Sequence, residues 1–245
     1  MNERYTEMAG RLIVALDYPD ADQASALLQQ LEGIPCYMKV GMQLYYAAGP
    51  AFVRDLKTRG YKVFLDLKMH DIPNTVKGGA ESITRLGVDM FNVHAAGGKD
   101  MMEASLQGVD KALQSDPSLS KPLVIAVTQL TSTGQEMLNR EIGIPGTVKD
   151  AVIRYAKLTQ AAGLDGVVAS AQESGDIAAA CGSDFVTVTP GIRPAGSDQG
   201  DQKRVLTPGN AIRNGSSYIV VGRPITMAEK PREAAEQIIK EMMGA

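Results

Sequence analysis

The sequence predicts an α/β protein that folds as a closed (β/α)8 barrel, a TIM barrel, with residues 1–245 forming a single domain. Short runs rich in β-branched residues alternate with longer segments of helical periodicity. Eight such repeats in about 250 residues match an eight-stranded barrel. No linker, low-complexity stretch or charge block divides the chain. An open doubly wound sheet is the alternative, because it also alternates strands with helices.

The expected strands are short apolar runs that end in a charged, polar or glycine residue. Runs of this length suit parallel strands that are buried on both faces. In chain order they are expected at residues 11–16, 37–40, 62–67, 90–94, 123–128, 166–169, 185–189 and 218–221.

The segments between these strands place apolar residues at helical spacing. In the first of them, Leu27, Leu28 and Leu31 share one face. Glycines such as Gly60 and Gly87 follow segment ends, where a left-handed helix cap favours glycine. Helices are expected at residues 21–31, 51–59, 76–86, 100–113, 148–162 and 231–243.

Charge and composition indicate a cytoplasmic protein. The net charge is −3 and no basic block is present, which argues against a nucleic-acid partner. No apolar run approaches the roughly 20 residues of a membrane helix, and the first residues lack the apolar core of a secretory signal. The two cysteines, Cys36 and Cys181, are far apart in the sequence, so we expect reduced thiols.

Four charged residues are expected to converge at one mouth of the barrel. Asp17 ends the first strand and Lys39 lies near the end of the second. Asp66 and Lys68 are two residues apart, at or just past the end of the third strand, so alternation points them the same way. Asp71 follows in the loop. A structural ring of ion pairs is the alternative, but barrel enzymes keep their sites at this end of the strands.

A lysine between carboxylates suits acid catalysis of a decarboxylation. Nearby negative charge stabilises the ammonium form of Lys68, whereas a Schiff-base lysine must lose its proton. A carboxylate such as Asp66 would repel a substrate carboxylate until carbon dioxide leaves, although such ground-state repulsion is a contested mechanism. Proton transfer alone supplies about 10²–10⁴-fold, so binding energy from a remote group must contribute.

That remote group is expected to be a phosphate. Gly191 and Arg193 follow the seventh strand, and Gly222 and Arg223 follow the eighth. Loops after these two strands hold phosphate in many barrels, and arginine offers a bidentate fork. The polar loop at residues 191–204 fits a lid that closes over phosphate or, alternatively, a mobile solvated loop.

Few residues suit a metal. The only histidines are His70 and His94, and no cysteines cluster, which argues against a transition-metal site. A magnesium site remains an alternative, because Asp17 and Asp66 could supply oxygen ligands. His94 ends the fourth strand, where it could line the site or serve a structural role.

The run from Asp66 to Thr75, DLKMHDIPNT, resembles the signature of the orotidine 5'-phosphate decarboxylases. The resemblance covers nearly the whole chain and is closest to the bacterial branch. Further segments that resemble the family in the same order are residues 14–17, 39–41, 92–95, 128–131, 189–193 and 221–224.

This resemblance implies decarboxylation of orotidine 5'-phosphate to UMP in de novo pyrimidine biosynthesis, with no metal and no organic cofactor. It implies that Lys68 is the proton donor to pyrimidine C6. Asp66 and Lys39 would form the charged network, completed by Asp71 from the other subunit of a homodimer, so that the active sites are shared.

The resemblance also assigns substrate contacts. Asp17 and Lys39, joined by Thr75 of the partner, would hold the ribose hydroxyls. Ile72 would line the small pocket near the leaving carboxylate, and Thr131 would mark the loop near the pyrimidine ring. The residues implied to grip the phosphate are Arg193, Gln202, Gly222 and Arg223.

Two rival functions stay open. A metal-dependent sugar-phosphate decarboxylase or aldolase has a similar Asp-x-Lys-x-x-Asp run but carries a metal-binding acid where this chain has Lys39. A cation at that position would repel magnesium. A non-catalytic phosphate-binding barrel is the second rival, and it would not need Lys68 between two acids.

Overall fold

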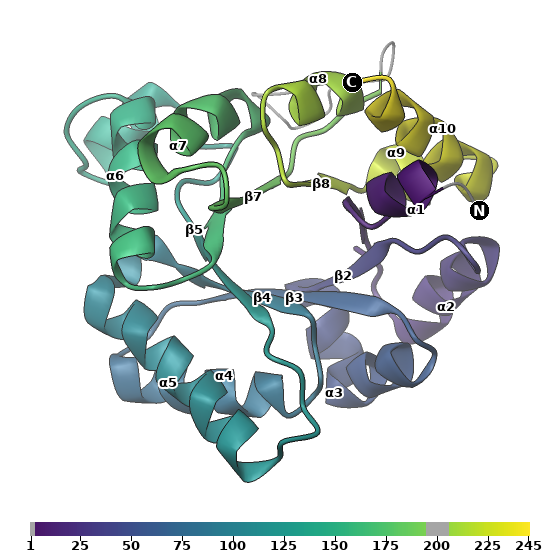
Figure 1. Ribbon diagram of the computed structural model, residues 1–245, viewed down its shortest axis with the longest axis horizontal. Helices are drawn as coiled ribbons and strands as arrows, with labels where there is room; N and C mark the ends of the chain where they lie inside the picture. The colour runs from purple at the N-terminus through teal and green to yellow at the C-terminus, as the bar shows by residue number, and fades with distance from the viewer. Residues whose placement is uncertain (1–2, 195–205) are drawn as a thin grey trace.

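The computed structural model describes residues 3–194 and 206–245, and the structural statements below refer to that part of the chain. Its eight strands are parallel and close into a barrel in chain order, with β1 paired to β8 (Figure 1). The helices surround this barrel. The closed order confirms the predicted (β/α)8 barrel and excludes the open sheet, which would leave two edge strands.

All eight predicted strands are present, most of them within a residue of the expected bounds. The largest difference is at the third strand, which runs two residues further because it contains a bulge. The strands are β1 Leu12–Ala15, β2 Tyr37–Gly41, β3 Lys62–Met69, β4 Met90–His94, β5 Leu123–Val127, β6 Gly166–Val168, β7 Val186–Thr189 and β8 Tyr218–Val221.

The six predicted helices are also present. The second of them, predicted at residues 51–59, begins at Met42, because a kink at Gly49 and Pro50 joins two helical pieces. Gly49 has φ 66°, a left-handed conformation that glycine adopts without strain. These helices are α2 Ala21–Gln30, α3 Met42–Thr58, α4 Pro73–Thr84, α5 Lys99–Ser115, α6 Val148–Ala161 and α10 Pro231–Met243.

Several short helical elements were not predicted from the sequence. Each spans at most eight residues, too few for a hydrophobic period to be recognised. They are α1 Glu3–Ala9, α7 Ser174–Cys181, α8 Pro208–Arg213, α9 Arg223–Thr226, the 3₁₀ turns Ala95–Gly97 and Ala171–Glu173, and a π-helical turn at Met137–Glu141. The first of them, α1, packs beside α10, and the Arg4 guanidinium donates to the Met243 carbonyl at 2.6 Å.

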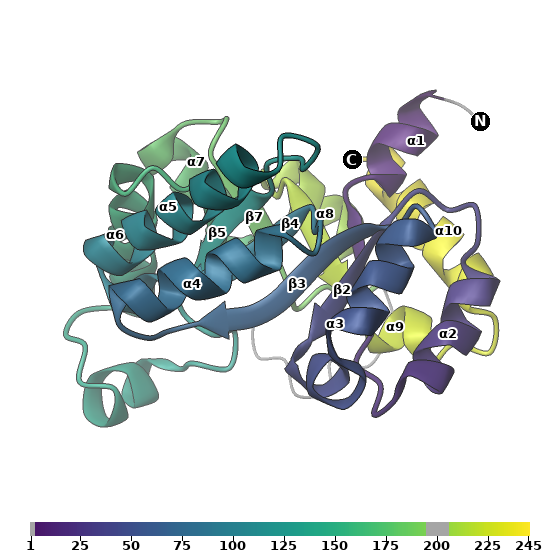
Figure 2. The ribbon, with the colours of Figure 1, turned by 90° about the horizontal axis from the view of Figure 1, so that it is seen from below.

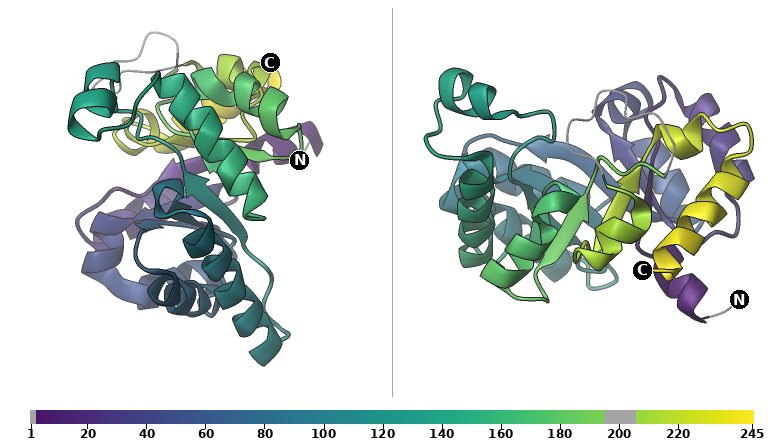
Figure 3. Two further views of the ribbon diagram at one scale, coloured as in Figure 1. Left: turned by 90° about the vertical axis from the view of Figure 1, so that its left-hand side faces the viewer. Right: turned by 90° about the horizontal axis from the view of Figure 1, so that it is seen from above.

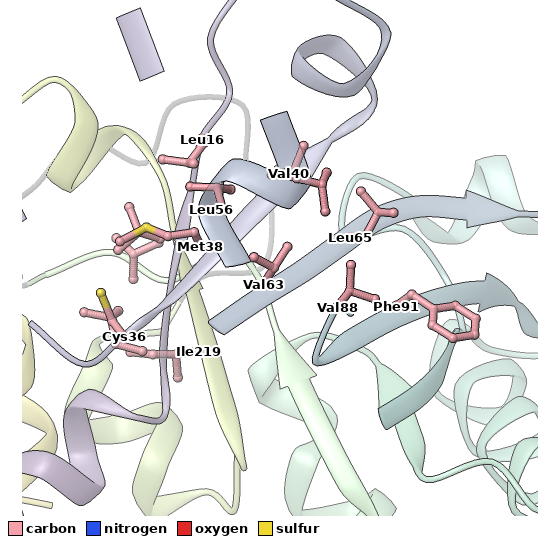
Figure 4. Packing of buried hydrophobic residues seen from close by; sticks show 14 of the residues in the cluster. Leu16, Cys36, Met38, Val40, Leu56, Val63, Leu65, Val88, Phe91 and Ile219 are labelled. Carbon is pink, nitrogen blue, oxygen red and sulfur yellow. The ribbon is translucent and has the colours of Figure 1, made fainter. Parts of the chain in front are cut away.

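Alternation along each strand separates two apolar layers. One set of side chains fills the barrel interior, and the other set faces the surrounding helices. Figure 4 shows the outer layer, where Leu56 of α3 lies among Met38, Val40 and Val63 of the strands. The interior set is Ile13, Ala15, Tyr37, Phe64, Met90, Ile125, Val188 and Val220.

A polar layer lies above this apolar interior. Lys39, Asp66 and Asn92 each stand two residues beyond an interior apolar residue of the same strand, so they also point inward. All three are buried. The strand pattern therefore delivers charged and amide groups to the C-terminal mouth of the barrel, where barrel enzymes bind their substrates.

The connection at residues 128–147, between β5 and α6, projects from the barrel in the side views (Figures 2 and 3). Its internal hydrogen bonds hold it in one shape. The Gln135 amide donates to Asn139 at 2.7 Å and to the Gly146 carbonyl at 2.8 Å. The segment follows a strand, so it begins at the same end of the barrel as the polar layer.

Both cysteines are free thiols, as the sequence predicts. Cys36 is buried, and Cys181 is partly exposed. Burial raises the pKa of the Cys36 thiol to about 12. Among the helices that the structure describes, none combines the length and the apolar character that crossing a membrane requires.

Candidate active site

A cavity of about 660 Å³ opens at the C-terminal ends of the strands. Its volume falls in the range of small-molecule sites. It is lined by eight of the twelve site residues that the sequence indicated, namely Asp17, Lys39, Asp66, Lys68, Thr131, Arg193, Gly222 and Arg223. The cavity therefore joins the expected charged centre to the expected phosphate end.

The charged residues form a chain of alternating sign across three strands. The Lys39 ammonium lies 3.1 Å from Asp17 Oδ1 and 3.3 Å from Asp66 Oδ2. The other oxygen of Asp66 lies 2.7 Å from the Lys68 ammonium. Asp66 therefore bridges the two lysines. The four formal charges cancel, which reduces the cost of holding them away from water.

Burial and pairing act in opposite directions on this chain. Burial by itself raises the pKa of Asp66, but Lys39 and Lys68 more than offset it, so the pKa of Asp66 is lowered. Burial likewise lowers the pKa of Lys39, but Asp66 and Asp17 reverse the effect and raise it. Both groups are therefore charged at neutral pH. An ionised carboxylate thus stands beside the Lys68 ammonium.

Lys68 has a left-handed backbone conformation. Its φ of 53° is the only positive φ at a non-glycine residue in residues 3–194 and 206–245. The β3–β4 register shifts here: Leu65 pairs with Phe91 and Met69 with Val93, so four steps along β3 match two along β4. A conformation of this kind costs about 1–3 kcal/mol and persists where surrounding contacts impose it. Asp66 and Lys68 meet as predicted, but through this bulge rather than through regular alternation.

Asn92 of β4 is a part of the site that the sequence analysis did not assign. Its Nδ2 donates to Asp66 Oδ1 at 2.7 Å, and its Oδ1 accepts from the Lys68 backbone N–H at 2.8 Å. The side chain is 1% exposed. A polar residue in the middle of the apolar run 90–93 was the signal that could have identified it.

Gly41 makes room for the ion pair of Lys39 and Asp17. It ends β2 and faces the cavity layer. A Cβ at this position would lie 3.2 Å from Lys39 Nζ and 3.4 Å from Asp17 Oδ1. The absence of a side chain therefore permits this close approach of the two charged groups.

Basic residues that follow β7 and β8 also line the cavity. Pro190, Gly191 and Arg193 follow β7, while Gly222 and Arg223 follow β8 and lead into α9. The Arg193 backbone N–H donates to the Leu206 carbonyl at 3.0 Å, which joins the residues after β7 to those that lead into α8. Two arginines among the lining residues suit a doubly charged phosphate.

The remaining predicted site residues lie elsewhere. Asp71 is exposed, and its carboxylate accepts from the Ile72 N–H at 2.6 Å. Within the described part of the chain it pairs with neither Lys39 nor Lys68. Ile72 is 67% exposed, and Thr75 is exposed in the first turn of α4. Gln202 lies outside the described residues.

The two histidines lie next to the site but do not line the cavity. Their ring centroids are 5.5 Å apart. Burial lowers the pKa of His94, and His70 and Lys68 lower it further against the opposing effect of Asp66. His94 is therefore neutral at pH 7. Because His94 does not line the cavity, a structural role is the better interpretation of this residue.

The acidic residues of the site do not form a metal cluster. In the ranges that the structure covers, no three His, Cys, Asp or Glu residues are grouped so that they could hold a metal ion. Asp17 and Asp66, the two acids that could supply oxygen ligands, are bridged by the Lys39 ammonium.

The fold and the site together define a (β/α)8 barrel whose mouth holds a cavity lined by paired lysines and aspartates and by two arginines. The chain belongs to the orotidine 5'-phosphate decarboxylase / HUMPS family, whose sequence model matches residues 10–238. It is 52% identical over 237 residues to orotidine 5'-phosphate decarboxylase of Bacillus cytotoxicus, covering 97% of this chain and 99% of that protein.

Solved structures agree with this assignment. Orotidine 5'-phosphate decarboxylase from Lactobacillus acidophilus matches with a TM-score of 0.84 and 42% identity, covering 94% of this chain and 97% of that one. An uncharacterized conserved protein from Geobacillus kaustophilus matches with a TM-score of 0.83 and 43% identity, covering 94% and 99% of the two chains.

Proposed function

We propose that this chain is a carboxy-lyase that converts orotidine 5'-phosphate to UMP in de novo pyrimidine biosynthesis. The observation that carries the proposal is the chain of charges Asp17–Lys39–Asp66–Lys68, which shares one cavity with Arg193 and Arg223. A nucleotide with a carboxylate on its base places negative charge at two separated points. The cavity is lined by Lys39 and Lys68 of β2 and β3 and by Arg193 and Arg223 after β7 and β8.

The reaction breaks the bond between C6 and the carboxylate carbon. Carbon dioxide leaves, and the electron pair stays on C6. The Lys68 ammonium stabilises this pair and then transfers a proton to C6, after which the lysine regains a proton from solvent. The buried Asp66 carboxylate orients the ammonium and opposes the substrate carboxylate, whose departure relieves the repulsion.

Remote groups supply the remaining binding energy. Arg193, Arg223 and the backbone at Gly222 hold the phosphate, with Gln202 assigned there by the family resemblance. Asp17 and Lys39 hold the ribose hydroxyls, and Thr131 lies along the pyrimidine ring. Fixing both ends of the substrate positions C6 at Lys68, since orientation alone can supply several kcal/mol of the barrier.

The position of Lys39 disfavours the metal-dependent rival. Its ammonium lies within 3.3 Å of both Asp17 and Asp66, in the space that a magnesium ion between these acids would occupy. Binding a divalent cation there would require the displacement of a buried positive charge. The proposed reaction therefore uses no metal.

We expect the chain to decarboxylate orotidine 5'-phosphate at an unchanged rate after treatment with EDTA, because no step needs a metal. The loss of absorbance on conversion to UMP measures the rate. Magnesium added back is expected to have no effect. Activity that disappears on chelation and returns with magnesium would contradict the proposal, and a protein that binds UMP without turnover would favour the non-catalytic barrel.

We also propose that the active chain is a homodimer with shared sites. Asp71, Ile72 and Thr75 form an exposed stretch at the C-terminal end of β3 and the start of α4, next to the cavity but outside it. An exposed isoleucine and carboxylate in this place suit insertion beside the Lys68 of a second copy. Asp71 would then complete the charged network, and Thr75 would reach the partner's ribose.

Mixing Lys68→Ala chains with Asp71→Ala chains tests this sharing. In a mixed dimer one site carries both substitutions, while the other has native Lys68 and native Asp71. Random exchange gives about half mixed dimers, so about a quarter of native activity should return. Native mass spectrometry verifies the exchange. A mixture that exchanges yet stays as inactive as its parents would show that each site uses residues of one chain.

A further inference from the structure

The Asn92 side chain makes two hydrogen bonds, one with the Lys68 backbone N–H and one with the Asp66 carboxylate. The same carboxylate oxygen also accepts from the Lys68 ammonium. We propose that Asn92 is a positioning residue for the decarboxylation: it holds the Lys68 backbone in its left-handed conformation and fixes the carboxylate that directs the Lys68 ammonium. This inference rests on the proposed function for its kinetic consequence but not for its geometry.

The first contact is with the backbone of Lys68. The register shift between Leu65 and Met69 removes Lys68 from the regular β3–β4 ladder. Bulges leave backbone groups without ladder partners. The Asn92 Oδ1 takes up the Lys68 N–H at 2.8 Å in place of a strand carbonyl. The side-chain amide therefore supplies the hydrogen bond that the bulge loses.

The second contact is with the carboxylate of Asp66. The Asn92 Nδ2 donates to Asp66 Oδ1 at 2.7 Å, and the Lys68 ammonium donates to the same oxygen at 2.7 Å. The three residues thus form a closed ring of hydrogen bonds. Only one orientation of the amide makes both hydrogen bonds. A flip would place the Asn92 NH2 against the Lys68 N–H and the Asn92 oxygen against the Asp66 oxygen.

Burying the polar side chain of Asn92 costs free energy, which indicates that its hydrogen bonds have a function. The side chain is 1% exposed and stands two residues beyond Met90, which packs in the apolar interior. A buried amide is tolerated only when its hydrogen bonds are made, and an apolar residue would pack there without that requirement. Asn92 does not line the cavity, so it acts through Lys68 and Asp66.

Asn92→Leu tests the inference, because leucine keeps the same branched shape and loses both contacts. We expect kcat for orotidine 5'-phosphate to fall about 10- to 100-fold, since small displacements of a reacting group have effects of this size. KM and the affinity for UMP should change less than about threefold, because the phosphate and ribose contacts remain. Equal loss of kcat and UMP affinity, or native kcat, would overturn the inference.

The matched control is Thr187→Val. Thr187 is as buried as Asn92, and its side chain also makes two backbone contacts, at 3.1 Å to the Gly215 carbonyl and 3.1 Å from the Ser217 N–H. It does not line the cavity. We expect this variant to keep kcat within about twofold while losing similar stability, which separates positioning from general damage to the barrel.

Asn92→Asp adds a signature in pH. The introduced carboxyl faces Asp66 and Lys68 on β3, with Lys39 on β2 and His94 on its own strand. When protonated it can donate to Asp66 as the native amide does, and when ionised it repels Asp66. We expect kcat relative to the native chain to be highest at acidic pH and to fall at least about tenfold as pH rises. If the ratio of the variant's kcat to the native kcat were constant with pH, the proposed hydrogen-bonded ring of Asn92, Lys68 and Asp66 would be contradicted.

A crystal structure of Asn92→Leu separates this inference from the proposed function. We expect the Lys68 φ to leave the left-handed region and its ammonium to move away from Asp66 Oδ1. An unchanged Lys68 would overturn the inference even if the native chain is an active decarboxylase. A native chain without decarboxylase activity would refute the proposed function, and this structure would still decide whether Asn92 positions Lys68.

Discussion

Lys68→Ala is expected to lower kcat for orotidine 5'-phosphate by at least about 10⁴-fold. Two contributions are lost together. Proton transfer by a positioned side chain is worth about 10²–10⁴-fold, and one preorganised electrostatic contact about 3–4 kcal/mol, or 10²–10³-fold. Because the ammonium lies 2.7 Å from Asp66, the variant also leaves that carboxylate beside the substrate carboxylate with Lys39 as its remaining cation.

Binding of UMP should survive this change. The phosphate end of the cavity, at Arg193 and Arg223, lies on the loops after β7 and β8 and is not altered by the substitution. Single-turnover kinetics measures the chemical step, and calorimetric titration with UMP measures the affinity. We expect an affinity within about tenfold of native, since the lost ammonium is one contact among several.

The matched control for this experiment is Lys111→Ala. Lys111 forms a 2.8 Å pair with Glu81, and its side chain is 62% exposed. Surface pairs of this kind contribute about 0–1 kcal/mol. The control should keep native kcat and nearly native stability. If Lys68→Ala retained kcat within about tenfold of the control, the role of Lys68 as proton donor would have to be abandoned.

Asp66→Asn is expected to cost about 3–5 kcal/mol of unfolding free energy as well as most of the activity. The substitution preserves shape but removes the charge that pairs with both Lys39 and Lys68. Lys39 is buried, so within the described part of the chain its ammonium keeps only the more exposed Asp17 as a partner. Breaking a buried ion pair from one side has a cost of this size.

The stability difference should depend on pH in a defined way. The pKa of Asp66 is lowered in the folded chain, because Lys39 and Lys68 outweigh burial. Its contribution is therefore fully present above the unfolded pKa of about 3.9 and is lost as pH falls through the lower folded value. The pKa of Lys39 is raised, so its contribution is lost only as pH rises above about 10.4.

Urea unfolding of the native chain and of Asp66→Asn between about pH 3 and pH 9 measures this difference. The gap should be constant from about pH 5 to pH 9 and should narrow below about pH 4. Asp55→Asn is the control, because the Asp55–Arg59 pair is 3.5 Å long and exposed. A gap no larger than that of the control, at any pH, would mean that the buried pairs contribute little to folding.

Much of the fold could be predicted because its signals are local. Each parallel strand is buried on both faces, so it appears in the sequence as a short apolar run, and each long helix has an amphipathic period. The short helices α7, α8 and α9 span at most eight residues, too few to show that period. The first half of α3, which lies before the kink at Gly49 and Pro50, was likewise not indicated by the sequence pattern.

The candidate site was predictable where residues follow strand ends. Because parallel strands end at one mouth, Asp17, Lys39 and Arg223 were expected in one cavity, and they lie there. The contribution of Asn92 was not predictable, since its two hydrogen bonds depend on the register between β3 and β4. Register is a property of the paired strands and not of either strand alone.

By itself, the sequence determined the number of strands, their positions along the chain and the charges at their C-terminal ends. Only the tertiary structure decided how Lys68 meets Asp66, because the bulge in β3 and the left-handed φ of 53° exist through contacts with β4. It also decided that Lys39 lies between Asp17 and Asp66, where Gly41 leaves space. Local pattern specifies which groups reach the mouth of the barrel, and the pairing of neighbouring strands specifies the distances between them.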